Sequence, residues 1–400
     1  MGGKFIRFAI VLLAALLAAS FAFAGGKSKR AQQKQIAVKI VENVAGVKAK
    51  DLVIISGKAR DMDLLEDLAL EVIKKGAHQL RFSGRETFST RYFDEIPAER
   101  DSDPPAWSLK LTELADVKII VQGEENPSRF KKVPIERMIA ARKAHRPVYE
   151  LEHKRGVRRV FLGNGLYPTR ATARQYGLSK RQLEKIFWAG LNVDYQKLQE
   201  TGAKLRGILE AGKQVHITNK NGTDIKFGIE KRPIMVSDGV ISEEDVKKGG
   251  AATLVWLPAG EVMVAPVPGS AEGKVVFDRF PIEDSAVFKM TMTFVKGKMA
   301  SVTAKKNAGF KRWKDIHDTC KDAGKDDFSW VNFGINPNVK IPKKSKLVTW
   351  MPAGMVSCGI GGNDYMGGDN TATYGAGGFI PGSTVKVDDK VIIENGKLKI

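Results

Sequence analysis

Apolar and polar positions follow two rhythms between residues 35 and 160, and their alternation predicts strands and helices in turn. Residues 52–55 and 117–121 are short apolar runs typical of buried strands, and residues 78–82 have strand-like spacing. Residues 35–47 and 61–75 carry apolar positions at helical spacing, and Gly76 stands where a glycine commonly ends a helix. Strands that alternate with helices predict a parallel sheet with crossover helices.

The following segments predict helices and then mainly β structure. In residues 168–200, Pro168-Thr169 opens one helix, and Gly177-Leu178-Ser179 ends it and starts a second. A basic stretch around residues 135–145 is also expected to be helical. The residues Asn221-Gly222 between two apolar stretches, 215–217 and 225–227, predict a β-hairpin, because this pair tolerates a positive φ.

A shift in composition near residues 235–250 predicts two domains. Residues 41–240 are expected to form a Rossmann-like α/β domain, and residues 241–400 a β-rich α+β domain, so the predicted fold class is α/β. The first predicted strand is followed by neither GxGxxG nor GxxxxGK[ST]. The sequence therefore does not support a dinucleotide or nucleoside triphosphate site.

Residues 1–24 have the pattern of a secretory signal peptide. Lys4 and Arg7 precede an uncharged run that ends in Ala22-Phe23-Ala24, a small-residue cleavage pattern. A membrane anchor is the alternative, but spanning a bilayer takes roughly 20 apolar residues and this run is shorter. Residues 25–40 are expected to be a flexible basic leader. The pattern predicts an exported protein, periplasmic or extracellular, with no transmembrane segment after cleavage.

The chain is basic, with 65 Lys and Arg against 45 Asp and Glu and a formal net charge of +20. Residues 129–159 concentrate eleven of these cations against Glu136, Glu150 and Glu152. This segment is either an anion-binding face or a solvated helix and loop, and we favour the second interpretation. Proteins that bind single-stranded nucleic acids stack the bases on aromatic side chains placed among basic ones. Such aromatic residues are sparse here, so we expect no nucleic-acid partner. An anionic cell-envelope surface is the more reasonable counter-charge.

The two cysteines of the chain exclude a disulfide-built scaffold. Cys320 and Cys358 lie 38 positions apart, and export would permit a bridge between them. Two unpaired buried thiols are the alternative, because the sequence does not show whether the two residues come within bonding range. Cys358 is a weak candidate nucleophile, since no GxSxG motif or partner histidine motif accompanies it.

The C-terminal half carries a series of motifs in a fixed order. Residues 257–262 read LPAGEV, and residues 265–273 read APVPGSAEG. They resemble the LPxGEVFTAP-like motif of the thermophilic metalloaminopeptidases, the aminopeptidases T and S. Four further stretches resemble motifs of the same family: GTDI at 222–225, FGINPN at 333–338, GMVSCGIG at 354–361, and the tail at 385–396.

This resemblance implies a fold, a site and a reaction. The family has an N-terminal α/β domain and a C-terminal β-rich domain that holds two divalent ions such as Zn, Co or Mn, usually in a homodimer. Such an ion pair activates a bridging water and polarises the scissile carbonyl beside the N-terminal residue of a peptide. The implied substrate is therefore a peptide.

The family's metal ligands are two Glu, two His, a Tyr and an Asp, and this sequence departs from them. Glu261 matches the first Glu, and Tyr365 matches the Tyr if one residue is inserted. The resemblance thus makes Glu261 and Tyr365 the candidate catalytic residues, with Glu261 also the candidate metal ligand. The other four ligand positions are substituted, by Asn332, Ser357, Tyr374 and Ala376.

Other residues do not replace the missing ligands. The five histidines fall outside the ligand motifs: His78, His145, His153, His216 and His317. Asp364 and Asp369 either form a new oxygen-only site or cap a glycine-rich turn, and we favour the cap. The glycine-rich segment 354–382 either lets a ligand approach the backbone or serves tight turns.

Two hypotheses of function follow. The first is an exported aminopeptidase that retains activity through Glu261, Tyr365 and a remodelled metal set. The second is a non-catalytic peptide- or cell-envelope-binding protein on the same fold, with no cofactor or a weakly bound divalent metal. The ligand substitutions favour the second, because Asn, Ser and Ala supply no charged or imidazole donor. Whether the chain is an enzyme is left open by the sequence.

Overall fold

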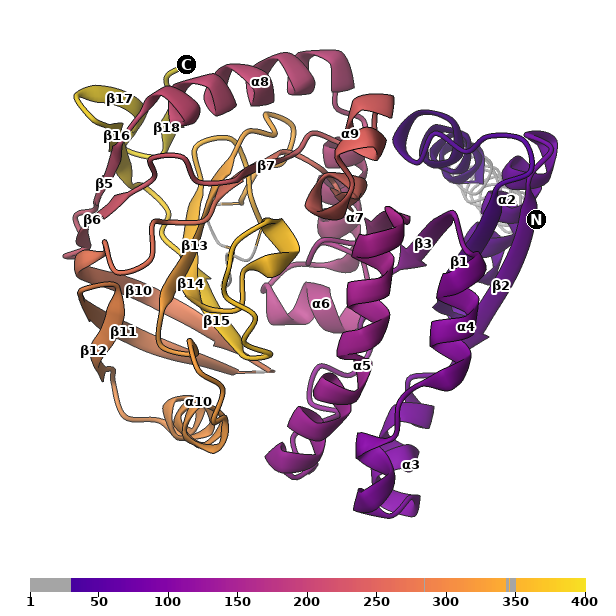
Figure 1. Cartoon of the computed structure of the whole chain (residues 1–400), viewed down its shortest axis with the longest axis horizontal. Coiled ribbons are helices and arrows are strands. Elements are labelled where there is room, and N and C mark those ends of the chain that lie inside the picture. The colour runs from indigo at the N-terminus through magenta and orange to yellow at the C-terminus, as the bar shows by residue number, and fades with distance from the viewer. Residues whose placement is uncertain (1–29, 284, 343–344, 346–349) are drawn as a thin grey trace, which may run out of the picture.

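The computed structural model describes residues 30–283, 285–342, 345 and 350–400. The predicted signal peptide and residues 25–29 of the predicted leader lie outside these residues. Residues 30–40 of that leader are helical, with Ile36, Ala37 and Ile40 buried, so they are not the flexible segment that we expected. Figure 1 shows β1, β2 and α2 at one end of the molecule, the antiparallel strands at the other, and α5 between them. In the described part of the chain, no helix is both long and apolar enough to cross a membrane.

The strands of the N-terminal half form a parallel sheet, as predicted. Its order is β2-β1-β3-β4-β8. Their bounds are β1 Leu52–Lys58, β2 His78–Gly84, β3 Val117–Val121, β4 Arg158–Leu162 and β8 Leu254–Leu257. From β1 the chain adds β2 on one side and then β3 on the other. The order therefore reverses between β1 and β3, where open α/β sheets commonly bind ligands at their carboxyl edge.

Most of the helices agree with the predictions. Residues 30–39 are helical and continue into a π-helical turn, Ile40–Val44. Thr169 caps α6 and Ser179 caps α7 with a full capping box, as the sequence predicted. The remaining bounds are α2 Met62–Lys74, α3 Thr87–Glu95, α4 Ala106–Leu114, α5 Ile135–Arg155, α6 Arg170–Gln175, α7 Lys180–Leu191, α8 Tyr195–Ala211, α9 Glu243–Lys248 and α10 Ala308–Thr319.

Two of the predicted helix boundaries were wrong. The helix expected over 135–145 continues through Pro147 and ends at Gly156, which adopts a left-handed conformation. Residues 168–200 contain α6, α7 and the start of a third helix, α8, instead of two helices. Asp194 accepts a hydrogen bond from the Lys197 N–H and so starts this third helix.

The rest of the chain forms two antiparallel sheets. One has eight strands in the order β12-β11-β10-β6-β5-β16-β17-β18, and the other has five in the order β15-β14-β13-β9-β7. The expected hairpin joins β5 and β6, with Gly222 at a φ of +102°. The bounds are β5 Gln214–Thr218, β6 Asp224–Gly228, β7 Ile234–Ser237, β9 Glu261–Val264, β10 Glu272–Ile282, β11 Ser285–Val295, β12 Lys298–Thr303, β13 Phe328–Gly334, β14 Val356–Gly361, β15 Gly375–Phe379, β16 Thr384–Val387, β17 Lys390–Glu394 and β18 Lys397–Leu398.

Sheet membership crosses the predicted domain boundary at residues 240/241 in both directions. β5, β6 and β7 precede it but pair with strands of the C-terminal half. β8 follows it but extends the parallel sheet beside β4. The division into domains stays a prediction, while the α/β fold class with its added β-rich part is confirmed.

The basic segment 129–159 is less of a solvated surface than we expected. Arg137 contacts Asp101 at 2.5 Å, and both side chains are largely buried. Arg158 is 2.6 Å from Asp51 and also donates to the Ala45 carbonyl. Much of this charge is therefore used to join helices and strands, through Arg129, Arg137, Lys143, Arg146, Arg155, Arg158 and Arg159.

Both cysteines are free and buried. Of the two alternatives for Cys320 and Cys358, the structure has unpaired thiols. Burial raises the pKa of the Cys358 thiol, which disfavours the thiolate that a nucleophile requires.

Candidate functional site

The motif at residues 257–262 is the point where the chain passes from the parallel sheet to the five-stranded sheet. β8 ends at Leu257, and β9 begins at Glu261. Gly260 lies between them at a φ of +126°, and a Cβ there would approach the Asn336 backbone nitrogen to 2.8 Å. The Asn336 amide donates to the Ala259 carbonyl at 2.6 Å. The shape of this motif is thus a requirement of the fold, independent of any chemistry at Glu261.

Three of the residues at family ligand positions share one face of the five-stranded sheet. Met263 lies opposite Asn332, and Asn332 lies opposite Ser357, so these side chains project to the same side. Glu261 is two positions from Met263 on β9 and projects to that side too. The sheet therefore places Glu261, Asn332 and Ser357 together.

Glu261 is a buried carboxylate with few partners. One oxygen, Oε1, accepts a hydrogen bond of 2.7 Å from the amide of Asn164, in the loop after β4. The amide of Asn332 lies 3.4 Å from Oε2. Burial raises the pKa of Glu261, and the hydrogen bond from Asn164 opposes that rise. This is the environment of a carboxyl group kept from water and held by amides.

Apolar side chains fill the space beside Glu261. Burial is the main cause that raises the pKa of Tyr365, and the charge of Glu261 adds to it. The two side chains therefore lie close together in the same buried region. The Tyr365 ring meets Trp256 edge to face, with centroids 6.0 Å apart. The cluster consists of Met235, Leu254, Met263, Ala265 and Met366, with Phe161, Ala251, Trp256, Trp330 and Tyr365 packed against it.

The glycine-rich segment makes room for one member of this cluster. A Cβ on Gly359 or on Gly377 would overlap the indole ring of Trp330. Trp330 is two positions from Asn332 on β13 and projects to the same face. At these two glycines, the group that lies close to the backbone is therefore the Trp330 ring and not a bound ligand.

Tyr374 and Ala376 do not join Glu261, contrary to the convergence that the resemblance implied. Tyr374 meets His317 edge to face at 5.5 Å and belongs to the main core. Ala376 lies opposite Ile360 and also packs against that core. In a strand, neighbouring residues project to opposite faces, and Ala376 is on the face away from Glu261.

The remaining candidate ligands are engaged elsewhere. Asp364 contacts Arg146 at 2.6 Å, and Asp369 contacts Arg232 at 2.8 Å, so they do not form a common oxygen site. Among the described residues, no three His, Cys, Asp or Glu side chains gather as a metal site would need. One carboxylate, amides, a hydroxyl and a phenol among methionines and tryptophans do not fit two divalent ions.

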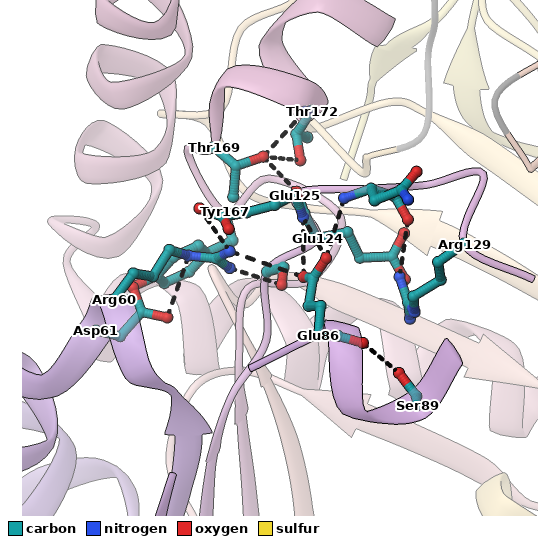
Figure 2. Close-up of polar contacts among 12 residues, drawn as sticks. Arg60, Asp61, Glu86, Ser89, Glu124, Glu125, Arg129, Tyr167, Thr169 and Thr172 are labelled. Atoms are coloured by element: carbon teal, nitrogen blue, oxygen red, sulfur yellow. Dashed lines mark hydrogen bonds and ion pairs between the residues drawn. The ribbon is translucent and has the colours of Figure 1, made fainter. Parts of the chain in front are cut away.

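A second polar cluster, which the sequence reasoning did not find, lies at the carboxyl edge of the parallel sheet (Figure 2). Arg60 follows β1, Glu86 follows β2, and Glu125 follows β3. Arg60 Nη1 is 3.1 Å from Glu125 and 3.7 Å from Glu86, and Nη2 donates to the Gly123 carbonyl at 2.7 Å. Polar residues directly after each strand were the signal that could have revealed this site.

This cluster borders a cavity of about 650 Å³. Asp61 lies at its wall and accepts a hydrogen bond of 2.7 Å from the Tyr167 hydroxyl. Burial raises the pKa of Asp61, which the hydrogen bond from Tyr167 and the charge of Arg60 oppose. Phe187 and Trp188 of α7 line the cavity as well, and Tyr167 packs edge to face on Phe187.

The fold defined by these sheets is that of an aminopeptidase T-type α/β protein. The wild-type AmpT of Thermus thermophilus superposes with a TM-score of 0.73 at 17% identity, over 92% of this chain and 99% of that one. The 2,5-dihydroxypyridine dioxygenase of Pseudomonas putida KT2440 superposes with a TM-score of 0.60 at 13% identity, over 92% and 97%.

The chain belongs to the thermophilic metalloprotease family M29, whose family model matches residues 29–315. This confirms the resemblance found in the motifs. A search of curated protein sequences finds no match. The family consists of metal-dependent peptidases, so its substrates are peptides. The roles of Glu261 and Tyr365 in this chain stay predictions.

Proposed function

We propose that this member of the M29 family binds peptides but does not hydrolyse them, because it lacks the two-metal centre. One observation carries the proposal: the face around Glu261 is occupied by methionine and tryptophan side chains where a metal pair would need charged and imidazole donors. Asn332 and Ser357, which share that face, contribute neutral donors only. Neutral donors would leave most of the positive charge of two divalent ions without opposite charge.

The runner-up is hydrolysis through Glu261 and Tyr365 with a remodelled metal set. The shared environment of the two side chains favours it, because Tyr365 lies close enough for the charge of Glu261 to affect its pKa. In that case Glu261 would be the one carboxylate available to hold a divalent ion, which would polarise a peptide carbonyl when bound.

The deciding experiment pairs metal content with turnover. The purified protein is incubated with Zn²⁺, Co²⁺ or Mn²⁺, dialysed, and assayed for bound metal and for cleavage of an aminoacyl reporter. We expect substoichiometric metal and no metal-dependent turnover. Glu261→Gln is the test variant, and Glu210→Gln, an exposed partner of Arg206 on α8, is the matched control. Stoichiometric metal with turnover that Glu261→Gln abolishes and Glu210→Gln retains would overturn the proposal.

Peptide binding is measured separately, in EDTA. Calorimetric titration with a mixture of short unmodified peptides should give heat of binding in the wild type and in Glu261→Gln alike. Absence of binding to all of them would remove the peptide-binding half of the proposal while leaving the metal result intact.

We also propose that the protein is exported and that its basic surface faces an anionic cell envelope. The signal-like residues 1–24 and the net charge of +20 support this. A reporter fused after residue 40 should reach the periplasm or medium, and the same fusion without residues 1–24 should stay inside the cell. The homodimer that the family resemblance implies is tested by sedimentation of the mature chain.

A further inference from the structure

The cavity at the carboxyl edge of the parallel sheet has the features of a ligand site separate from Glu261. It lies beside the point between β1 and β3 where the strand order reverses. Loops from the ends of successive strands meet there without filling the space, which is why α/β proteins bind ligands at such points. Glu261 does not line this cavity, so a ligand bound here is independent of any peptide hydrolysis at the Glu261 face.

Asp61 is not explained by a structural role. It occupies the cap position before α2 but makes no side-chain cap hydrogen bond. Its side chain is only 8% exposed and lines the cavity. Oδ1 accepts from Tyr167, whereas Oδ2 has no hydrogen-bond donor among the described residues, and Arg60 Nε is 3.5 Å away. A buried carboxylate oxygen without a donor is a costly arrangement unless something supplies one.

The charge around Asp61 favours a cation as that donor, because four carboxylates line the cavity against three cations: Asp61, Asp63, Glu125 and Glu184 against Arg60, Arg170 and Lys180. Arg60 is shared among Asp61, Glu86 and Glu125, so three carboxylates face one guanidinium in a protein with a net charge of +20. Arg60 Nη2 donates to the Gly123 carbonyl, and Nη1 lies 3.1 Å from Glu125 and 3.7 Å from Glu86, so this guanidinium is largely engaged by other partners. At the rim, Lys180 lies 3.7 Å from Glu184.

The opposite wall is aromatic and apolar. Tyr167, Phe187 and Trp188 form a chain of edge-to-face contacts with centroids 5.5 and 5.4 Å apart. Gly123 maintains this packing, because a Cβ there would come within 2.5 Å of the Tyr167 ring and 2.6 Å of Arg60 Nη2. Aromatic faces attract cations and also accept an alkyl body.

We propose that this cavity binds a primary ammonium group on an apolar body, with the ammonium N–H groups donating to Oδ2 of Asp61 and the body against Trp188. The hydrogen bond is charge-assisted, and it supplies the donor that Oδ2 of Asp61 lacks among the described residues. Such an ammonium group comes either from a small amine or from the amino end of a peptide.

The test compares two probes of the same shape, 3-methylbutylamine and 3-methylbutan-1-ol, by calorimetry and ligand-observed NMR on the full mature chain. We expect the amine to bind at least tenfold more tightly than the alcohol. Asp61→Asn should abolish this preference, and Glu261→Gln should retain it. Asp278→Asn, an exposed carboxylate paired with Lys289, is the matched control and should behave as the wild type.

Two results would overturn the proposal: equal binding of amine and alcohol, or an amine preference that survives in Asp61→Asn. If Asp61→Asn does not fold, Trp188→Leu tests the same site, and an unchanged amine affinity there would count against it. Competition by a tripeptide amide with a free amino end, but not by its acetylated form, assigns the ammonium to peptides. Failure of both tripeptides to compete assigns it to small amines.

Discussion

The contact between Asn164 and Glu261 allows a direct test of how Glu261 is held. Asn164→Ala removes the donor of the 2.7 Å hydrogen bond to a buried carboxylate. A hydrogen bond to a charged group contributes about 1.5–3 kcal/mol, and one to a neutral group about 0.5–1.5 kcal/mol. Once the carboxylate is charged, Asn164→Ala should therefore cost about 1–1.5 kcal/mol more in the wild type than in Glu261→Gln.

The double-mutant cycle removes the other effects of the alanine. Asn164 has a φ of +42°, which alanine tolerates less well, and its amide also donates to the Pro258 carbonyl at 3.1 Å. Alanine brings the backbone strain and the loss of this hydrogen bond in both backgrounds. These costs cancel in the coupling energy. Urea unfolding followed by circular dichroism, in EDTA, gives the four free energies of unfolding. Asn219→Ala, whose amide donates to the Pro381 carbonyl, is the control and should be additive with Glu261→Gln.

The sign of the pH dependence follows from the raised pKa of Glu261. The folded state holds this proton more tightly than the unfolded state, so the stability contributed by the group is lost as pH rises through the folded pKa. Glu261→Gln should thus gain stability relative to the wild type as pH rises above 4.5, the ordinary pKa of a Glu, while the coupling to Asn164 grows. A coupling that stays below about 0.3 kcal/mol as pH rises would refute this account, since distant residues show such values. If added Zn²⁺ stabilised the wild type but not Glu261→Gln, Glu261 would instead be identified as a metal ligand.

Two further predictions concern buried groups elsewhere. Burial, with Arg159 and Arg146 nearby, lowers the pKa of His153 to about 4 from 6.5, so the unfolded chain takes up this proton first and stability falls between pH 6.5 and pH 4. The loss from pH 7.5 to 4.5 should be smaller in His153→Gln by about 1–2 kcal/mol, because solvent screens this half-buried ring. Urea unfolding measures the two losses, and an equal loss in both proteins would contradict the prediction. Cys320 and Cys358 should react with a thiol reagent only after unfolding, without prior reduction, and a need for reductant would indicate a disulfide.

The parts of the fold that could be predicted are those whose signal is local. The apolar run at 52–55 and the helical spacing at 61–75 correspond to β1 and α2. β4 was missed because it begins with Arg158 and Arg159, which are buried through partners outside the strand, Asp51 and Glu152. Similarly, nothing local to residues 254–257 shows that β8 extends the sheet formed by β4.

The candidate site was predictable to the same extent. Glu261 was identified because LPAGEV at residues 257–262 resembles a motif of the family, and that motif is a short, local stretch of sequence. In the glycine-rich segment, by contrast, spacing alone had to decide which residues face Glu261. A shift of one residue moves a side chain to the other face of a strand, and this is why Ala376 was expected beside Glu261 but lies in the main core.

The pairing of β5 with β16 has a consequence for the order in which the chain can fold. Val215 pairs with Val387, a partner 172 positions later in the sequence. On a ribosome, β5 and its hairpin partner β6 are therefore complete long before the strand that closes their sheet has been made. Sheets of such high contact order form slowly, and their unpaired edges stay exposed in the meantime. The nascent protein thus remains incompletely folded at least until β16, residues 384–387, has been synthesised.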